Sequence, residues 1–206
     1  MKAQKIVLII VFAVCLMGLT RCSKKVSQSD IIVDKISWTE EGIFEDYEKM
    51  GLLIRNNSDT ATDIEINAEC YDKNGNYLDK RSASIYALSP GNEYIMNVSL
   101  DSGIADVSYS YECEKTRYEA IASSDMLASF ESENGTGTLT VKNNSDKDTK
   151  ECNCAILFYG ESGKIVGFTS VSMNHGDIPK GKTVSEEIDY PIIYESVHIY
   201  INAYSK

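Results

Sequence analysis

The sequence predicts an all-β protein in which two antiparallel β-sandwiches follow an N-terminal signal or anchor segment. Three observations support this prediction. The chain begins with a short apolar run, much of the remainder alternates apolar and polar residues at the period of a strand, and the two halves repeat the same order of motifs.

The N-terminal segment has the pattern of a secretory signal. Lys2 and Lys5 precede an uninterrupted apolar run over residues 6–19. As a helix this run would rise about 21 Å, which falls short of the roughly 20 residues that a membrane-spanning helix needs. We therefore expect residues 1–21 to be a signal peptide, with an uncleaved short anchor and plain secretion as the alternatives.

The end of this run resembles the lipobox of bacterial lipoproteins. Residues 19–23 read LTRCS, and the resemblance implies cleavage before Cys22 and lipidation of its thiol. The lipobox has a small residue before the cysteine, where this chain has Arg21. An acyl anchor would hold the protein on the outer face of the cell membrane, and residues 22–30, which are polar and aperiodic, would form a tether.

The mature chain would be strongly acidic. Cleavage before Cys22 leaves 17 Lys and Arg residues against 31 Asp and Glu residues, a formal net charge of −14. Such a surface repels phosphate backbones and anionic headgroups, so we expect no nucleic-acid partner and membrane contact through the lipid alone. Solubility outside the cell explains the acidity more simply than a cationic ligand does. The sequence has no Gly-rich phosphate loop, and we expect no cofactor.

The two halves of the chain repeat one another. Residues 52–59 (LLIRNNSD) recur as residues 139–146 (LTVKNNSD), at an offset of 87. The offset then grows only at turns, where insertions are tolerated. The further matches are Tyr71 and Gly75 with Tyr159 and Gly163, residues 88–91 with 178–181, and Val107, Tyr109 and Tyr111 with Val197, Ile199 and Ile201. We predict one repeat over residues 31–115 and a second over residues 116–206.

Each repeat has the pattern of short strands and turns. Residues 64–70 alternate apolar with polar side chains. In a strand this alternation places all the apolar side chains on one face, whereas in a helix it would spread them around the axis. Residues 94–100 and 184–190 show the same alternation, interrupted at Glu186. Asn, Asp, Gly and Pro residues, which favour turns, separate such runs. Six or seven short strands per repeat favour an Ig-like sandwich.

The turns carry a resemblance to a known family. In the first repeat an Asn-Asn-Ser turn precedes a strand that ends in Tyr71-Asp72-x-x-Gly75, and a Leu-x-Pro-Gly turn follows. This arrangement resembles the FxLYD-type repeats of Gram-positive surface lipoproteins. The first repeat keeps only Tyr and Asp of the name pattern, and the second has Gly160 after its tyrosine. The resemblance implies small Ig-like modules without assigned chemistry and contributes no catalytic residue.

Four cysteines follow Cys22, namely Cys70, Cys113, Cys152 and Cys154. In the repeat alignment Cys152 and Cys154 stand where the first repeat has Ile64 and Ile66, and Cys70 and Cys113 stand where the second has Phe158 and Ala203. We therefore expect unpaired thiols at core positions, where cysteine behaves as a small hydrophobe. A Cys70–Cys113 disulfide and a Cys152–Cys154 metal pair are the alternatives, and the metal pair lacks two further ligands.

A possible calcium loop is better interpreted as a turn. Asp72, Asn74 and Asn76 have the spacing of the first calcium ligands, but Tyr77 and Ala83 replace the required glycine and the bidentate acid. We interpret this segment as a hairpin turn and predict no metal site.

No pattern in the sequence predicts an enzyme. His175 and His198 lie near no nucleophile motif, and His198 should face solvent because its neighbours in the strand face inward. The acid pairs at residues 40–41 and 186–187 are more simply solvated charges than a general acid and base.

Two non-enzymatic functions follow from these observations. We favour a membrane-anchored interaction or structural module with an unidentified protein or glycan partner, and the alternative is a lipoprotein that binds a solute, peptide or glycan. Tyr71 and Tyr159 are the candidate ligand-binding residues, since they occupy matching places on the face opposite the core. Their alternative role is to cover a sheet edge or the junction between repeats. Trp38 is expected in the core.

Overall fold

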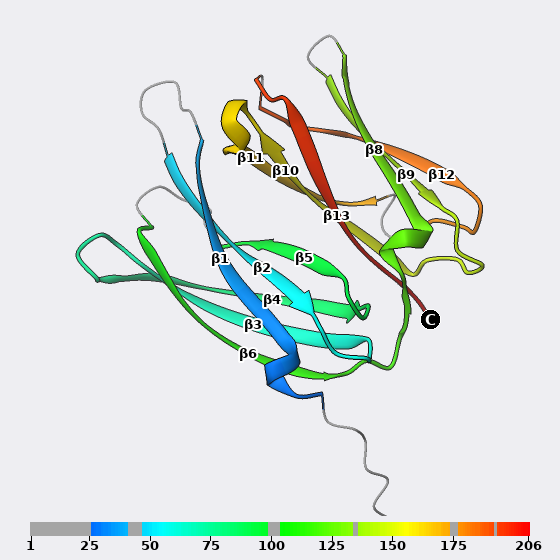
Figure 1. Cartoon of the computed structure of the whole chain (residues 1–206), viewed down its shortest axis with the longest axis horizontal. Coiled ribbons are helices and arrows are strands. Elements are labelled where there is room, and N and C mark those ends of the chain that lie inside the picture. The colour runs from blue at the N-terminus through cyan, green and yellow to red at the C-terminus, as the bar shows by residue number, and fades with distance from the viewer. Residues whose placement is uncertain (1–25, 41–46, 99–103, 134–135, 174–176, 192) are drawn as a thin grey trace, which may run out of the picture.

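A computed structural model describes residues 26–40, 47–98, 104–133, 136–173, 177–191 and 193–206 (Figure 1). Within these ranges the regular structure consists of β-strands and three single turns of 3-10 helix. The predicted all-β class is confirmed.

The strands fall into two halves of the chain. The first half, residues 26–115, contains η1 (Gln28–Asp30), β1 (Ile31–Glu40), β2 (Tyr47–Asn56), β3 (Thr62–Tyr71), β4 (Tyr77–Leu88), β5 (Glu93–Asn97) and β6 (Asp106–Lys115). The second half, residues 119–206, contains β7 (Glu119–Ile121), η2 (Ser123–Asp125), β8 (Met126–Glu133), β9 (Thr136–Asn143), β10 (Glu151–Tyr159), η3 (Glu161–Gly163), β11 (Ile165–Ser172), β12 (Thr183–Ile188) and β13 (Ser196–Ser205).

Each half is built from two antiparallel sheets. In the first half the strand orders are β1-β2-β5 and β4-β3-β6, and in the second they are β12-β9-β8 and β11-β10-β13-β7. The orders correspond strand for strand, except that β7 adds a short edge strand beside β13. All strand pairs in the described ranges are antiparallel.

A separate apolar core fills the space between the two sheets of each half. Ile54 of β2 and Ile66 of β3 meet in the first core, and Val141 of β9 and Cys154 of β10 meet in the second. All four side chains are fully buried. Burial of such apolar surface is the dominant favourable contribution to folding.

Matching asparagines organise one turn in each half. The buried Asn56 amide donates to the backbone oxygens of Thr60 (2.9 Å) and Leu88 (2.7 Å), and its side-chain oxygen accepts from Ser58. Asn143 does the same, donating to Lys147 (2.8 Å) and Ile178 (2.9 Å) and accepting from Ser145. The Asn-Asn-Ser motif therefore recurs because its first asparagine satisfies the buried backbone groups of two loops.

The residues just before β1 are folded onto the first half. Val26 is 9% exposed, and its backbone oxygen accepts a contact from the Cys113 thiol of β6 at 3.9 Å. Gln28 donates to the backbone oxygen of Tyr111, and the Tyr111 hydroxyl donates back to the Gln28 carbonyl, each at 2.9 Å. Residues 26–30, which were predicted to lie in a tether over residues 22–30, thus contact the folded body through Val26 and Gln28.

The two halves pack against each other through an apolar junction. The outer face of β1-β2-β5 contributes Leu53 and Ile95, and the outer face of β11-β10-β13-β7 contributes Ala155, Leu157 and Tyr200. All five are buried. Figure 1 shows the two sandwiches side by side, with β1, β2 and β5 facing the second half.

Trp38 belongs to this junction rather than to the core of the first half. It is 4% exposed, as expected, but its ring lies 5.8 Å from that of Phe168 in β11. Ile31 and Val33 point into the first core, whereas Ile36 points with Trp38 toward the second half. The predicted burial of Trp38 is confirmed, and the second half covers it because the outer face of β1 is also buried.

Hydrogen bonds between described residues also join the halves beside the apolar contacts. The Ser89 hydroxyl donates to the Ile121 carbonyl at 3.1 Å, and the Ser123 hydroxyl donates to the Asn92 side-chain oxygen at 2.9 Å. The Asn202 amide of β13 donates to the backbone oxygen of Tyr86 in β4 at 2.8 Å. These directional contacts set the relative orientation of the halves.

Candidate functional site

The two candidate tyrosines lie in different surroundings. The Tyr71 hydroxyl at the end of β3 donates to Glu69 at 2.8 Å, and its ring meets Tyr77 edge-on at 6.2 Å. Tyr159 at the end of β10 packs against the apolar junction. The structure does not bring the two residues together. The first half covers the sheet face that bears Tyr159, whereas Tyr71 lies on an exposed face of the first half.

Several predicted positions lie outside the described residues. These are the signal peptide over residues 1–21, the lipidation site Cys22, Glu41 of one acid pair, and His175. In the part of the chain that the structure describes, no helix has the length and apolarity needed to cross a membrane. His198 is exposed beside Tyr200, with ring centroids 4.4 Å apart, which confirms its predicted surface position.

The cysteines occupy the predicted interior with one exception. Cys70, Cys152 and Cys154 are fully buried, whereas Cys113 is half-buried under Val26. The structure holds all four as thiols rather than as disulfides. Burial raises the pKa of Cys70, and the neighbouring Cys152 together with burial raises that of Cys154, so both stay protonated.

The segment after β3 is a hairpin turn, as predicted. The Asp72 carboxylate accepts from the backbone N–H groups of Asn74 and Asn76, each at 2.8 Å, and from the Asn76 amide at 2.9 Å. These bonds, with Asn76 the strongest influence, lower the pKa of Asp72. Its oxygens are thus used within the turn. Among the described residues no three His, Cys, Asp or Glu side chains are grouped to hold a metal ion.

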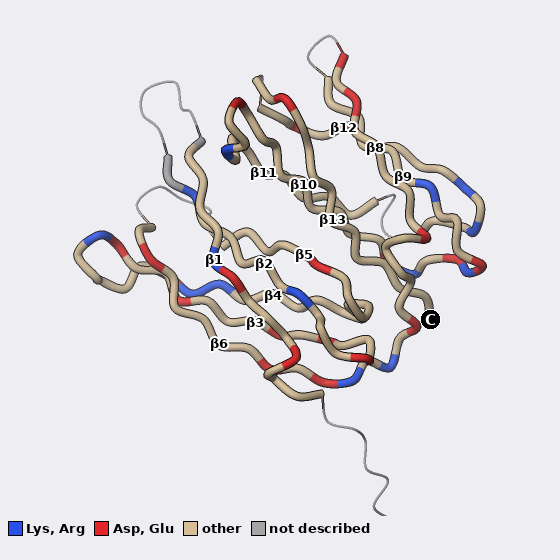
Figure 2. The backbone as a smooth tube through the Cα atoms, in the orientation of Figure 1, with Lys and Arg blue, Asp and Glu red and all other residues tan. Residues whose placement is uncertain are grey.

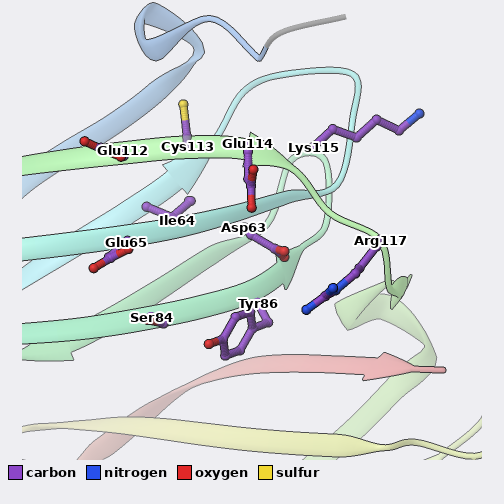
Figure 3. Close-up of a pocket in the computed structure, with 10 residues that line it drawn as sticks. All are labelled: Asp63, Ile64, Glu65, Ser84, Tyr86, Glu112, Cys113, Glu114, Lys115 and Arg117. Atoms are coloured by element: carbon purple, nitrogen blue, oxygen red, sulfur yellow. The ribbon is translucent and has the colours of Figure 1, made fainter. Parts of the chain in front are cut away.

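An open groove of about 980 Å³ lies on the outer side of sheet β4-β3-β6, next to the second half (Figure 3). Its lining consists of Asp63, Ile64 and Glu65 of β3, Ser84 and Tyr86 of β4, Glu112, Cys113, Glu114 and Lys115 of β6, and Arg117 of the connection between the halves. In Figure 3 the Arg117 side chain extends toward Tyr86 and Asp63, whereas Lys115 and Cys113 point away. We call this feature the acidic groove.

A β-bulge places the aromatic residue of the acidic groove. The register of β3 and β4 shifts between Thr62 and Ile64, so Asp63 stands opposite both Tyr86 and Ala87. Ala87 has φ of +53°, and its N–H donates to the Asp63 carboxylate at 2.8 Å. A positive φ is strained for a residue with a Cβ atom, and such bulges re-aim a side chain. Tyr86, which directly precedes Ala87, is 42% exposed.

Tyr86 belongs to a cluster of three tyrosines, with Tyr118 of the connection and Tyr204 of β13. The Tyr86 ring meets Tyr118 and Tyr204 edge-on at 6.0 and 6.3 Å, and Tyr118 lies 4.7 Å from Tyr204. The Lys150 ammonium lies 4.6 Å from the centre of the Tyr118 ring, a cation–π distance. Burial, and then the hydrogen bond that Tyr204 donates to Glu151, raise the pKa of Tyr204. Tyr86 is thus held in place by the junction.

Like charges face each other across two strands of the groove. Glu65 stands directly opposite Glu112, and Asp63 directly opposite Glu114. Directly opposed like charges destabilise a sheet. The corresponding pairs of the second half are Asn153 with Asn202 and Glu151 with Tyr204, which carry less charge. Figure 2 shows acidic positions of β3 and β6 side by side along the lower edge of the first half.

Comparison with known proteins assigns no family. No family model matches the chain, and no curated protein matches it. Among solved structures, the crystal structure of red sea bream transglutaminase aligns with a TM-score of 0.28 and 9% identity. The alignment covers 84% of this chain but 29% of that chain. A likeness this weak carries no argument about function.

The sequence named a junction between repeats only as an alternative place for Tyr71 and Tyr159, and Tyr159 does pack there. The other residues of the junction and the acidic groove were not predicted. A signal for the junction is present, because residues 155–158 are a continuous apolar run where the first half has alternation. Such a run is typical of a strand that is buried on both faces. The groove has no comparable signal, since it depends on a bulge and on residues from three strands and a connection.

Proposed function

We propose that this chain is an extracytoplasmic lipoprotein, held on the outer face of the cell membrane by acylated Cys22, that acts as a non-enzymatic interaction module. In this proposal the module consists of two tandem Ig-like repeats over residues 31–115 and 116–206. The corresponding strand orders and the matching turns at Asn56 and Asn143 support the repeat.

The apolar junction is the observation that best supports an interaction module. Leu53, Ile95 and Leu157 bury the facing surfaces of the halves, so the halves would move as one body. Domains joined by a small polar contact usually move independently. A fixed pair of sandwiches presents its outer faces and loops in a constant arrangement, which suits recognition of a partner on or near the cell.

The position of Val26 supports a short connection to the membrane. Val26 contacts Cys113 of β6, and three residues lie between Val26 and Cys22 in the sequence. Three extended residues span roughly 10 Å. The folded body would therefore lie close to the membrane surface.

Intact mass of the membrane-extracted protein tests the anchor. We expect a mass that corresponds to cleavage before Cys22 with added acyl chains, and retention in the detergent phase. Cys22→Ala should abolish both the acyl mass and the cleavage, while the matched variant Cys15→Ala should leave them unchanged. An unmodified Met1 start in the wild-type chain would refute the lipoprotein proposal.

Ligand binding is a second candidate function, which the exposed Tyr86 ring in the acidic groove favours. An aromatic ring beside carboxylates can stack on a sugar or a peptide and accept its hydrogen bonds. Equilibrium binding to a panel of oligosaccharides and peptides tests this function. Tyr86→Ala should weaken binding, and Tyr77→Ala, which removes an exposed ring at the far end of β4, should not.

A further inference from the structure

We propose that the acidic groove docks an extended, lysine- or arginine-rich segment of a protein partner. This inference deepens the proposed interaction function by naming the chemistry of the partner. It rests on a sheet face that is exposed among the described residues and whose charge, spacing and position beside the junction each fit such a segment.

The outer face of β4-β3-β6 is the open counterpart of a face that already docks in this protein. In the second half the corresponding face of β11-β10-β13 carries Ala155 and Leu157 and is covered by the first half. In the repeat alignment Asn67 and Glu69 replace these two residues, and Glu69 is exposed. An apolar partner surface would leave such carboxylates unpaired and desolvated, which is unfavourable. The face therefore suits a polar partner.

Charge complementarity selects a basic partner. The acidic groove carries four carboxylates, at Asp63, Glu65, Glu112 and Glu114, and two cations, of which Lys115 points away. No ion pair within the described ranges uses Glu65, Glu112 or Glu114. A bound cation between the opposed carboxylates would relieve the repulsion within each pair.

The spacing of the carboxylates selects an extended segment. Glu65 and Asp63 lie two residues apart on one strand, so their Cα atoms are roughly 7 Å apart along it. Alternate side chains of an extended peptide have the same spacing and point to the same side. Two basic residues separated by one residue would each meet one opposed carboxylate pair.

A guanidinium of the chain itself already enters this end of the groove. Arg117 extends toward Tyr86 and Asp63 in Figure 3, and its Cζ atom lies 5.7 Å from the centre of the Tyr118 ring. The aromatic and acidic side chains therefore accommodate a cation there. Because Arg117 repels other cations, it should limit affinity for a basic partner.

Fluorescence anisotropy with the full-length protein tests the proposal. The probe is a short labelled peptide of alternating lysine and serine, and the control peptide has glutamate in place of lysine. We expect saturable binding of the lysine peptide at low ionic strength that weakens as salt is added, because exposed charges are screened. Absence of saturable binding would overturn the proposal.

Paired variants separate the groove from the general acidity of the chain. Glu65→Gln with Glu112→Gln should weaken binding about fivefold. Glu131→Gln with Glu187→Gln removes the same charge from exposed positions on β8 and β12 and should change affinity less than about twofold. Equal weakening by both double variants would show non-specific attraction and overturn the proposal.

A variant with the opposite expected sign completes the test. Arg117→Gln should strengthen binding of the lysine peptide about twofold, because it removes a competing cation. A loss of structure would weaken binding instead, and thermal unfolding of each variant distinguishes the two effects. Weaker binding by a folded Arg117→Gln variant would contradict the assigned role. The intact-mass result for Cys22 is independent of all these outcomes.

Discussion

The indole ring of Trp38 lies 5.8 Å from the phenyl ring of Phe168, and this contact joins β1 of the first half to β11 of the second. Gly51 on the neighbouring strand makes room for it, since a Cβ atom there would lie 3.3 Å from the Trp38 ring and 3.2 Å from the Met96 carbonyl oxygen. A small residue on β2 thus allows a large one on β1 to cover the junction.

A double-mutant cycle should measure this contact. Trp38→Ala and Phe168→Ala each remove buried aromatic surface, and the coupling between them should be about 1 kcal/mol, as for other aromatic pairs. Urea denaturation of the two single variants and the double variant gives the coupling energy. Additive effects, with no coupling, would mean that the rings do not stabilise one another.

We predict that a charge at Leu157, which is buried in the junction, separates the halves. The first half has Glu69 at the matching position, and Leu157→Glu would place this carboxylate in the buried junction. Burial of an unpaired charge costs several kcal/mol, so the halves should separate while each keeps its own core. We expect the wild-type chain to unfold in one transition and the Leu157→Glu variant to unfold in two.

Calorimetry and limited proteolysis at residues 116–118 check this outcome. Leu127→Glu is the matched control, because Leu127 is 55% exposed on the outer face of β8. The control should unfold like the wild type. A Leu157→Glu variant that keeps one transition and the wild-type cleavage rate would argue against a stabilising junction.

Comparison of β3 with β10 shows how far the sequence predicts this fold. The alternation at residues 64–70 predicted a strand with one buried face, and Ile64, Ile66 and Cys70 are buried as expected. The repeat alignment also placed Cys152 and Cys154 in the interior. These predictions are local, since each depends on the period of a strand and on an equivalent position.

Contacts between distant segments could not be predicted in this way. The sequence period predicts that Trp38 is buried. It does not show that Trp38 lies on the outer face of β1, which is buried only because the second half packs against it. The acidic groove contains a bulge at which Ala87 has a positive φ. Glycine usually marks such a position in a sequence, and here the residue is alanine. Equivalent positions, such as Tyr71 and Tyr159, therefore need not share a role.

The two turn asparagines should contribute similarly to stability. Asn56→Ala and Asn143→Ala each remove two hydrogen bonds that the amide donates to backbone carbonyls, one of them buried, and two that its oxygen accepts from a serine. A hydrogen bond contributes about 0.5–1.5 kcal/mol net, so we expect each variant to lose about 2–4 kcal/mol. Chemical denaturation measures both losses. Asn144→Ala, at an exposed position, is the control and should cost less than about 0.5 kcal/mol.

The junction should also make stability depend on alkaline pH. Burial, followed by the nearby Tyr159, raises the pKa of Tyr200 to about 12 from its ordinary value near 10. The folded protein then binds the phenolic proton more tightly than the unfolded chain does. The stabilisation that Tyr200 provides is therefore fully present below about pH 10 and is lost as the pH rises through about 12.

Tyr200→Phe tests this dependence because phenylalanine keeps the ring and has no proton to lose. Between about pH 10 and pH 12 its free energy of unfolding should fall less steeply than that of the wild type, as measured by urea denaturation at each pH. Tyr77→Phe, at a ring that is 57% exposed, should keep the wild-type slope. Since burial also raises the pKa of Tyr94 and Tyr204, part of the slope should remain in Tyr200→Phe. A slope identical to that of the wild type would mean that Tyr200 ionises as readily in the folded protein as in the unfolded chain, and that the junction admits solvent.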